Sequence, residues 1–545
     1  MSENNKISPD FTESDKIFGI GKGTLDTAQT FKDHFSEQEG MATEPEAIPH
    51  SAILVQLIEC FEALDFYALA FPQIEGLRKQ LAELDKKLTK SDGSLNDDEA
   101  LYRERKQWKD INDQIDNLTL NTKHFLILSI ENIRKIAEEK EWGLCKNNGF
   151  IYLYNGTHWA TVNKEAFQKF LGEASEKMGV AKYSARYYKF RDELFKQFNA
   201  TEFLPSPVPP KDIVLINLRN GTFEVTPIGT KLRPFDRADF LTYQLPFNYN
   251  PTAKAPLFDT YLNKVLPDKD SQKILSEYLG YVFVKTSSLK LEKILFLFGS
   301  GANGKSVCFD IVRALYGDQN TSEYSLSDLT DTKGYCRAMI ANKLVNYASE
   351  ISGKHEAAIL KQLASGEPLS ARLPYGEPFN ITDYAKLIFN ANEMSKDVEQ
   401  THAYYRRHLI IPFNVTITEA EQDKELAKKI IAKELSGVFN WVLDGLHRLL
   451  KQKTFSECEA ARAAVEQYAL HSDSVKMFIE DNAYKPSPNS NKLIKTFYLE
   501  YRAYCIEEGM SPVKKTNFIK RLQACSIIIE KNHDGNVAFV DKSKQ

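Results

Sequence analysis

Short apolar runs alternate with amphipathic segments in the middle of the chain. An apolar run at residues 294–298 is followed by a glycine-rich segment, and then by apolar positions at helical spacing over residues 307–316. Further apolar runs at residues 343–350, 385–390 and 406–413 predict additional strands. Buried strands separated by helical segments indicate an α/β domain built on a parallel sheet.

The first 140 residues show helical patterns only. Residues 51–71 are apolar and predict a helix that ends at Pro72. Apolar side chains then recur at spacings of three and four over residues 74–88, and the repeat resumes over residues 101–118 after a polar break. This arrangement predicts a helical hairpin, which serves either as a structural element or as an arm that binds a partner.

Two Asn-Gly dipeptides mark a mixed region that follows. Residues 155–156 and 220–221 lie beside strand-like segments, so each predicts a β-hairpin. A helical pattern follows the first hairpin to about residue 198, and another covers residues 259–284. We therefore expect an α+β region upstream of the glycine-rich segment.

The C-terminal part is mainly helical in pattern. Residues 419–450 carry an apolar stripe that predicts a lid or collar on the α/β domain, and residues 454–471 predict a helical linker. Beyond residue 473, a helix over residues 491–508, a second helix over residues 515–524 and two short strands around a Gly-containing turn are typical of a winged-helix domain.

Composition narrows the class of protein. The chain has 545 residues, of which 42% are hydrophobic and 26% charged, with a net charge of −4. This length predicts about three or four domains. No apolar run approaches a signal peptide or a membrane span, so we expect a cytoplasmic location. The seven cysteines form no C-x-x-C pair, which argues against a zinc ribbon or a disulfide framework.

The glycine-rich segment fits the phosphate-binding pattern G-x-x-x-x-G-K-[ST]. Its backbone N–H groups, together with the start of the following helix, are suited to bind phosphate. Lys305 is expected to reach the β- and γ-phosphates of ATP, and Ser306 to bind Mg²⁺. The predicted nucleotide-binding residues are Gly299, Ser300, Gly301, Ala302, Asn303, Gly304, Lys305 and Ser306.

Polar residues at the ends of the later strands complete the candidate catalytic set. Glu350 ends the second predicted strand, which we expect beside the first, and it is suited to polarise water or bind Mg²⁺. Asn392 follows the third strand and can orient water or contact the γ-phosphate, with Asn390 as the alternative. Arg406 and Arg407 precede the fourth strand, and one of them is a candidate arginine finger.

In their order, these elements resemble the helicase domain of superfamily 3, and more closely the phage and plasmid primase-helicase family related to the poxvirus helicase-primase. The resemblance covers about residues 140–545 and has its sharpest motifs in residues 299–413. It implies an AAA+ type core, a homo-hexameric ring, and ATP hydrolysis at subunit interfaces. It also implies that single-stranded DNA passes through a central channel. Lys305, Ser306, Glu350 and Asn392 would then act in cis, and Arg406 or Arg407 in trans.

The same resemblance implies a DNA-contacting hairpin near residues 361–378. Lys361 and Arg372 would track phosphates and Tyr375 would stack on a base. The chain departs from the family in two ways. It has one acid, Glu350, where many members of the superfamily have two, and its first 200 residues carry no primase signature.

The C-terminal domain is locally basic. From residue 511 onward, seven basic and three acidic residues give a net charge of +4. Lys514, Lys515, Lys520 and Arg521 lie on or beside the predicted recognition helix. This face is suited either to duplex DNA, such as an origin, or simply to solvent.

We therefore predict an α/β protein with an AAA+-like P-loop NTPase core, an α+β N-terminal region and a C-terminal winged-helix domain. Its expected function is that of an ATP- and Mg²⁺-dependent replicative DNA helicase of a phage, plasmid or integrated element. The alternative is a replication initiator or DNA-binding regulator that uses ATP as a switch. The predicted parts are a tail (1–48), a helical region (49–140), a pre-helicase domain (141–285), the helicase core (286–415), a collar (416–472) and the winged helix (473–545).

Overall fold

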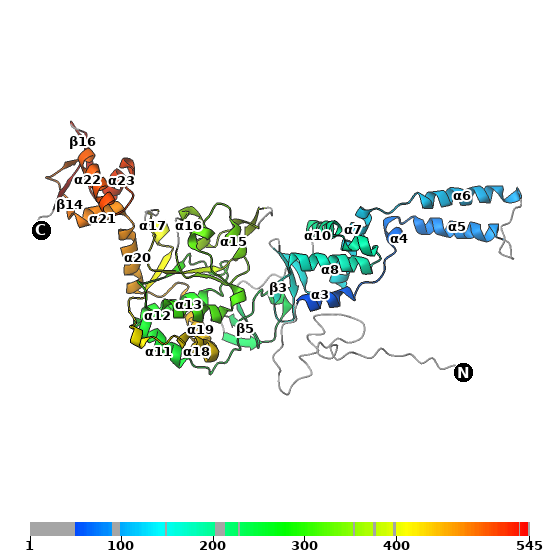
Figure 1. The fold of residues 1–545 in the computed structure, drawn as a ribbon, viewed down its shortest axis with the longest axis horizontal. Coiled ribbons are helices and arrows are strands. Elements are labelled where there is room, and N and C mark those ends of the chain that lie inside the picture. The colour runs from blue at the N-terminus through cyan, green and yellow to red at the C-terminus, as the bar shows by residue number, and fades with distance from the viewer. Residues whose placement is uncertain are drawn as a thin grey trace. The chain divides into compact units, whose positions relative to one another are not determined.

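The computed structural model divides the chain into two compact units. One comprises Met1–Pro209 with Phe235–Thr242, and the other comprises Pro210–Pro234 with Tyr243–Gln545. Figure 1 labels the helices and strands of both units. The structure describes residues 50–89, 99–147, 150–201, 213–226, 229–351, 355–373, 378–395, 399, 401–533 and 535–542. The predicted tail over residues 1–48 lies outside these residues.

The first unit is mainly helical. Its elements are α3 (His50–Ile58), α4 (Phe66–Ala70), α5 (Ile74–Leu88), η1 (Glu99–Leu101), α6 (Tyr102–Asp116), α7 (Thr122–Glu139), β1 (Leu144–Asn147), β2 (Phe150–Tyr154), β3 (Trp159–Thr161), α8 (Lys164–Lys177), α9 (Lys182–Arg186), α10 (Tyr188–Ala200) and η2 (Arg237–Asp239).

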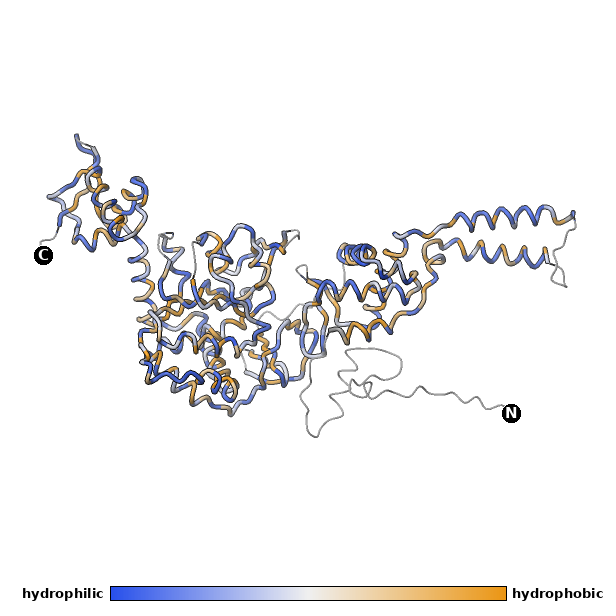
Figure 2. The backbone as a smooth tube through the Cα atoms, in the orientation of Figure 1, coloured by the Kyte–Doolittle hydropathy of each residue, from blue (hydrophilic) through white to orange (hydrophobic). Residues whose placement is uncertain are grey.

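The helical hairpin is confirmed as α5 and α6, which lie side by side (Figure 1). The indole N–H of Trp108 on α6 donates a hydrogen bond to Asp85 on α5 over 2.6 Å. In Figure 2 apolar and polar positions alternate along both helices. The single helix predicted over residues 51–71 is wrong, because the carboxylate of Asp65 accepts from Ala68 N–H and starts α4 as a separate helix.

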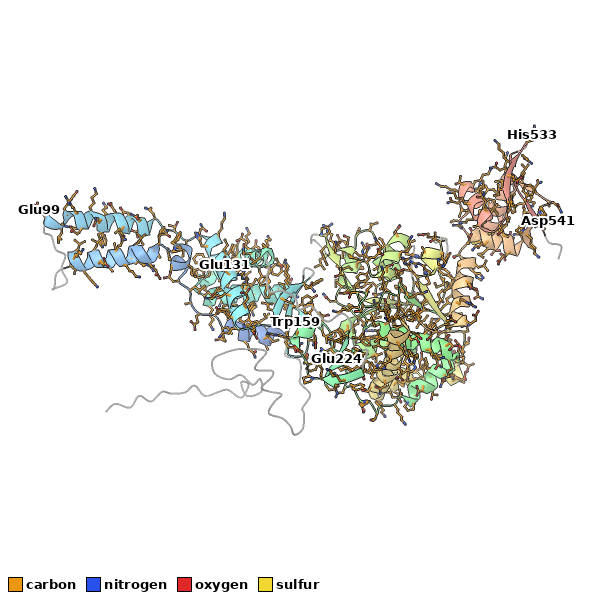
Figure 3. The ribbon with its side chains drawn as sticks, turned by 180° about the vertical axis from the view of Figure 1, so that it is seen from behind. Glu99, Glu131, Trp159, Glu224, His533 and Asp541 are labelled. Atoms are coloured by element: carbon orange, nitrogen blue, oxygen red, sulfur yellow. The ribbon has the colours of Figure 1, made fainter. Side chains whose placement is uncertain are left out.

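The helices α3, α7, α8 and α10 enclose the main core of the first unit, and β1, β2 and β3 form an antiparallel sheet beside it. The hairpin predicted at Asn155-Gly156 is confirmed, since Tyr154 of β2 pairs with Trp159 of β3. Trp159, labelled in Figure 3, is buried and donates its indole N–H to the Arg237 carbonyl over 2.7 Å. Residues 235–242 therefore belong to this unit although they lie far away in sequence.

The second unit contains the predicted α/β domain. Before the parallel sheet it has β4 (Val214–Leu218), β5 (Gly221–Thr226), β6 (Gly229–Arg233), α11 (Pro256–Val265) and α12 (Lys269–Tyr281). The α/β domain has β7 (Ile294–Phe298), α13 (Lys305–Tyr316), η3 (Asp318–Asn320), β8 (Thr321–Ser322), α14 (Leu326–Leu329), α15 (Tyr335–Met339), β9 (Val345–Ala348), α16 (Ala357–Ser365), β10 (Leu369–Arg372), β11 (Pro378–Ile381), β12 (Lys386–Ala391), α17 (His402–Tyr405) and β13 (His408–Pro412).

Five strands form the central parallel sheet in the order β13-β7-β12-β9-β8. β7 lies between β13 and β12, with Ile294 opposite His408 and Ala391 opposite Phe298. The expectation that the Glu350 strand lies beside β7 is wrong, because β12 intervenes and pairs with both. All five strands run in one direction, so their carboxyl ends still meet at one edge of the sheet.

Helices cover both faces of this sheet. In Figure 1, α12, α13 and α19 lie on one side, and α15 and α16 on the other. The single helix predicted over residues 259–284 is wrong, because the chain breaks at Pro267 between α11 and α12. Pro267 has no backbone N–H, and the carboxylate of Asp268 accepts from Ser271 N–H over 2.8 Å to start α12.

The predicted collar contains η4 (Glu419–Glu421), α18 (Leu426–Lys433), α19 (Leu435–Gln452) and α20 (Glu459–His471). Glu277 of α12 is fully buried and accepts from Arg448, Gln452 and Ser456, which fastens the collar to α12. The predicted linker over residues 454–471 is helical only from Glu459. Its Tyr468 is buried in the core of the α/β domain, so α20 is also part of that core.

The C-terminal elements form a small domain with its own apolar core. They are α21 (Ser474–Asp481), β14 (Tyr484–Pro486), β15 (Lys492–Leu493), α22 (Ile494–Glu507), α23 (Lys515–Ala524), β16 (Ile529–Asn532), β17 (Gly535–Ala538) and β18 (Val540–Lys542). The predicted second helix matches α23, and β17 pairs with both β15 and β16. Among the helices that the structure describes, none is both long and apolar enough to span a bilayer.

Candidate functional site

The glycine-rich segment connects the carboxyl end of β7 to the start of α13. Gly301, Ala302 and Gly304 all have positive φ angles, of 112°, 47° and 83°. Only glycine enters this region without cost, so the backbone of Ala302 is locally strained. Strain of this kind persists where the surroundings fix the backbone.

Four hydrogen bonds between the segment and groups outside it fix its backbone. Gly299 N–H donates to the Ala391 carbonyl over 3.0 Å, and Ile417 N–H donates to the Ala302 carbonyl over 2.7 Å. The Asn303 amide donates to the Phe413 carbonyl over 3.1 Å, and the Tyr261 hydroxyl to the Gly304 carbonyl over 2.9 Å. The backbone of the segment is therefore held in one shape.

Two of the glycines are required by close approach. A Cβ atom on Gly299 would lie 2.2 Å from the Asn303 amide and 2.4 Å from the Phe413 carbonyl oxygen. A Cβ atom on Gly304 would lie 2.6 Å from a methyl group of Val265. These spacings explain why glycine occupies both ends of the motif.

Lys305 is the first residue of α13 and is buried beneath the segment. Its ammonium donates to the Gly299 carbonyl over 2.5 Å and to the Asn303 side-chain oxygen over 3.2 Å. Burial lowers its pKa. Among the ion pairs of the described residues, none includes Lys305, so its positive charge has only neutral acceptors. Such a buried cation favours an anion at the same place.

Ser306 and two strand-end residues are exposed around this segment. Glu350 lies two residues beyond β9, and Asn392 directly follows β12. Asn392 is next to Ala391, whose carbonyl accepts from Gly299, so it lies beside the start of the segment. The structure thus brings the segment, Asn392 and Glu350 to the same edge of the sheet.

Asn390 is already engaged inside the sheet. Its side chain is buried, and its oxygen accepts from the Tyr347 hydroxyl over 2.9 Å. Tyr347 in turn contacts Phe309 on α13, with ring centroids 4.8 Å apart. Of the two asparagines, Asn392 is therefore the one exposed at the sheet edge. The described residues contain no group of three His, Cys, Asp or Glu side chains suited to bind a metal ion.

The two arginines lie at the opposite edge of the sheet, before β13. The Arg407 side chain is 10% exposed, and its guanidinium donates to the Ala403 carbonyl and to Ser365 Oγ over 2.5 and 3.0 Å. The Arg406 side chain is 49% exposed and pairs with Glu292 over 2.8 Å. Burial opposes ionisation of Glu292, but the charge of Arg407, then Lys290 and Arg406, lowers its pKa. Arg406 is thus the accessible member of the pair.

The predicted DNA-contacting segment contains an antiparallel hairpin, β10 and β11, with Arg372 opposite Pro378. Arg372 is exposed near the tip, and Tyr375 lies outside the described residues. Lys361 is on α16 and forms an ion pair with Glu399 over 2.9 Å. The charge of Lys361 is therefore balanced within the chain, and Arg372 is exposed beside the tip of the hairpin.

In the C-terminal domain, Lys514, Lys515 and Lys520 are exposed at and along α23. None of the ion pairs between described residues includes them. Arg521, by contrast, is bound to the buried Asp473 over 3.1 Å. Of the four predicted basic residues, three are therefore exposed lysines without an acidic partner among the described residues.

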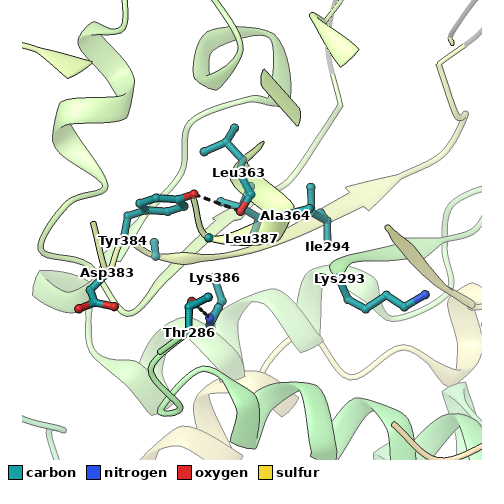
Figure 4. Close-up of a pocket in the computed structure, with 11 residues that line it drawn as sticks. Thr286, Lys293, Ile294, Leu363, Ala364, Asp383, Tyr384, Lys386 and Leu387 are labelled. Atoms are coloured by element: carbon teal, nitrogen blue, oxygen red, sulfur yellow. Dashed lines mark hydrogen bonds between the residues drawn. The ribbon is translucent and has the colours of Figure 1, made fainter. Parts of the chain in front are cut away.

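The sequence patterns missed a partly buried charge, Lys386, at the amino ends of the strands. Lys386 lies in a small pocket beside Thr286, to which it donates over 2.9 Å (Figure 4). Its ammonium also lies 4.2 Å from the centroid of the Tyr281 ring, and burial lowers its pKa to about 8. A lysine at the start of an apolar strand is the only signal in the sequence, and it does not distinguish a buried from an exposed side chain.

Comparison with known proteins gives two matching family models. A model described as D5 N terminal like matches residues 131–267, and a family of unknown function, DUF5906, matches residues 297–407. A protein of Acanthamoeba polyphaga mimivirus, named "Putative helicase L207/L206", is 26% identical over 187 residues. That match covers 32% of this chain but only 19% of the viral protein.

Solved structures of the NrS-1 C-terminal region are also similar. One, the apo structure of residues 305–718, has a TM-score of 0.41 and 13% identity, and covers 75% of this chain and 98% of that one. Another, an A form apo structure, has a TM-score of 0.33 and 13% identity, and covers 61% and 97% of the two chains. TM-scores of 0.41 and 0.33 are too low to support a conclusion about fold or function. The family models and the viral relative agree with the resemblance to the phage and plasmid primase-helicase family that the motifs carry.

Proposed function

We propose that this protein is an ATP-dependent DNA helicase with an AAA+-like P-loop core. The observation that supports this most is the fixed, positive-φ segment at the end of β7, with a buried lysine that has no acidic partner among the described residues. Backbone N–H groups and the start of α13 would bind the phosphates of ATP, and the Lys305 ammonium would exchange its neutral acceptors for phosphate oxygens.

The exposed oxygens at the same edge suit the remaining chemistry. Ser306 would bind Mg²⁺ directly, and Glu350 would either contact the ion through water or polarise the attacking water. Asn392 would orient that water or the γ-phosphate without adding charge. Since β12 separates β7 from β9, Glu350 is about two strand spacings, roughly 10 Å, from the axis of β7. This leaves room for the phosphate and water between them.

Arg406 would complete the site of a neighbouring subunit. β13 has five residues and runs parallel to β7, so Arg406 lies roughly 16 Å from the phosphate-binding edge. A guanidinium there cannot reach the nucleotide bound by its own chain. It is accessible, however, and Glu292 holds it at the surface. These facts support catalysis between subunits in an oligomer, for which we propose a homo-hexameric ring.

The β10–β11 hairpin would contact single-stranded DNA in the central channel of this ring, chiefly through Arg372 and Tyr375. The C-terminal domain would act as a winged helix, with Lys514 just before α23 and Lys515 and Lys520 within it contacting duplex DNA phosphates. These three lysines also favour the second candidate function, an initiator that binds duplex DNA and uses ATP as a switch.

Steady-state ATP hydrolysis, with and without single-stranded DNA, tests the proposal. The full chain should hydrolyse ATP with Mg²⁺ and accelerate on single-stranded DNA, and Lys305→Ala should abolish both. An unwinding assay on tailed duplexes should then show strand separation. Slow hydrolysis that is indifferent to single strands, with tight duplex binding lost in Lys514→Glu, would instead establish the switch-like initiator.

A further inference from the structure

Three tyrosines of the first unit are exposed within a run of six residues. The exposed fractions are 88% for Tyr183, 50% for Tyr187 and 67% for Tyr188. Large aromatic side chains contribute strongly to cores and interfaces, so a cluster of exposed rings is more informative than a single one. We call this cluster and its neighbouring lysines, Lys182 and Lys189, the tyrosine face.

Local folding explains why these rings point outward. α9 has only five residues, and Tyr187 adopts an extended conformation between α9 and α10, with φ of −69° and ψ of 131°. The buried positions of this stretch are Ala185, Phe190 and Leu194, which pack into the core with α8. Because those residues fill the core, the tyrosines between them remain on the surface.

The rings also have room for flat ligands. The centroids of Tyr187 and Tyr188 are 5.0 Å apart, and their planes meet at 68°, so the two rings do not cover each other face to face. At least one ring face of each is therefore free of its neighbour. A planar group such as a nucleobase can stack on such a face.

The charge around the rings is positive although the chain as a whole is negative. Residues 180–191 contain four basic residues and no acidic one. Arg186 binds Glu176 through two hydrogen bonds of 2.8 and 3.1 Å. Arg186, first through a hydrogen bond and then through its charge, and after it Lys182 and Arg191 lower the pKa of the Glu176 carboxyl. Glu176 thus faces three cations, of which Arg186 also interacts with Glu173.

The two lysines of the face keep their charge for a ligand. Lys182 and Lys189 are exposed, and no ion pair found between described residues includes either. Two acids follow: Asp192 is paired with Lys196 over 2.8 Å, and Glu193 is exposed. Phosphates of a nucleic acid backbone are the complementary ligand, and counterion release would favour their binding.

We propose that the tyrosine face binds single-stranded DNA, with unpaired bases stacked on the tyrosines and phosphates contacted by Lys182 and Lys189. Exposed rings interleaved with basic side chains match the way in which proteins hold single strands. A duplex would offer only its phosphates, because its bases are already stacked on one another. The tyrosine face lies in the first unit, whereas the nucleotide-binding segment lies in the second. The proposal rests on the proposed function only in naming DNA, and not RNA, as the single strand that is bound.

The test is fluorescence anisotropy of a fluorescein-labelled oligo-dT, titrated with the full chain carrying Lys305→Ala and no nucleotide. Combined Tyr183→Ala, Tyr187→Ala and Tyr188→Ala should weaken binding at least about tenfold, since each stacked base contributes about fivefold or more. The matched Tyr→Phe triple variant, which keeps the rings, should bind like the parent. Tyr67→Ala, an exposed tyrosine elsewhere in the unit, should also leave binding unchanged.

Salt dependence tests the phosphate contacts. The double variant Lys182→Glu, Lys189→Glu should reduce the slope of log affinity against log salt concentration by about 1.4. Each lost contact with a single-strand phosphate accounts for about 0.7 of this change. Lys135→Glu, whose parent lysine pairs with Glu139, is the control and should leave the slope unchanged.

Several outcomes would overturn this site. Unchanged oligo-dT affinity in the alanine triple variant would exclude it, and so would equal losses in the phenylalanine and alanine variants. If the alanine variant changed the sedimentation of the chain but not its DNA affinity, the face would contact a second copy instead. Stronger loss on oligo-U than on oligo-dT would assign it to RNA. The binding assay uses Lys305→Ala and therefore does not depend on ATP hydrolysis. If the wild-type chain showed no DNA-stimulated ATP hydrolysis, the proposed helicase function would be refuted, but the measured binding of DNA by the tyrosine face would still stand.

Discussion

The two edges of the parallel sheet are chemically opposite. At the carboxyl ends of the strands, which we call the loop edge, the polar side chains of Ser306, Glu350 and Asn392 are exposed. At the amino ends, which we call the arginine edge, Glu292, Lys386 and Arg407 are bound to partners within the chain. The loop edge therefore offers polar groups to a ligand, whereas most polar groups of the arginine edge are already paired within the chain.

This contrast shows which charges are available for chemistry. Charged residues occur at both edges, so their presence alone does not mark a site. At the arginine edge most of them are bound to partners within the chain, which suits a role in stability, and Arg406 is the accessible one of the two arginines. Variants at the two edges should accordingly separate effects on ATP hydrolysis from effects on folding.

The largest expected effect comes from Arg406. Arg406→Ala should lower ATP hydrolysis by about 10³ to 10⁵-fold, because a finger neutralises charge in the transition state, while the fold stays intact. Mixing Arg406→Ala with Lys305→Ala subunits should restore part of the activity, since some interfaces then combine an intact loop edge with an intact Arg406. No recovery in the mixture would place Arg406 outside the site of the neighbour.

At the loop edge, Glu350→Gln should reduce hydrolysis by about 10² to 10⁴-fold, as expected for loss of a general base. Nucleotide binding should persist, because the segment over residues 299–306 is unchanged. Isothermal titration with a non-hydrolysable ATP analogue and a steady-state assay measure the two quantities. The control is Glu393→Gln, an exposed acid at the end of the neighbouring strand. Equal losses in both variants would contradict a specific role for Glu350.

The loop edge could be predicted from the sequence, and the arginine edge could not. The glycine-rich motif has a fixed spacing with a physical cause, so its strand, turn and helix followed directly. Strand order did not follow, because β9 and β12 have the same apolar pattern and either could lie beside β7. Their positions depend on contacts between segments far apart in sequence.

The sequence also does not show which of two adjacent residues of the same type is buried, because this too depends on contacts with residues far away in sequence. Arg406 and Arg407 are adjacent and chemically identical, yet only the structure shows that Arg407 points inward to Ser365, 42 residues away in sequence. Likewise, Lys361 and Arg521 looked like DNA contacts, but distant acids, Glu399 and Asp473, pair with them. Exposed tyrosines were missed because a helical pattern identifies buried positions and says little about the remainder.

Arg407 should affect stability where Arg406 affects catalysis. Arg407→Ala should destabilise the second unit by about 3 kcal/mol, since it removes a buried guanidinium and leaves the Ala403 carbonyl and Ser365 without their donor. Arg406→Ala should cost less than about 1 kcal/mol, as usual for an exposed ion pair. Hydrogen exchange of the β7 and β13 amides measures both. Similar exchange in the two variants would contradict the distinction.

His408, at the start of β13, predicts acid sensitivity of the arginine edge. Burial lowers its pKa to about 3, against an ordinary value of 6.5, and the charges of His355 and Lys293 act in the same direction. The unfolded chain therefore binds the extra proton between pH 6.5 and 3, so stability is lost as pH falls through this window. By pH 4 the loss is roughly 3 kcal/mol.

His408→Phe removes this titration and should keep the stacking on Phe296, where the ring centroids are 4.9 Å apart. Its stability should consequently fall less steeply between pH 6.5 and 4 than that of the parent. The thermal midpoint of the second unit, recorded by calorimetry across this range, measures the slope. His402→Phe, an exposed histidine six residues earlier, should keep the parent slope. An unchanged slope in His408→Phe would show that other groups cause the acid sensitivity.

The smallest effect is expected at Lys386, where the arginine edge carries a cost. Its pKa of about 8 in the folded chain lies below the ordinary 10.5, so the unfolded chain binds more protons between these values. Stability should rise as pH increases from 8 to 10.5, and below pH 8 the full cost of the buried ammonium remains.

Lys386→Met avoids that cost but loses the contact with the Tyr281 ring, which contributes about 1 kcal/mol. The variant should thus be about 2 kcal/mol more stable at pH 7, and the gain should disappear above pH 10.5. Calorimetry at both pH values measures the gain, and Lys135→Met, at an exposed lysine of the first unit, should show none. A destabilised Lys386→Met at pH 7 would mean that Lys386 contributes more to the arginine edge through Thr286 and Tyr281 than its burial removes.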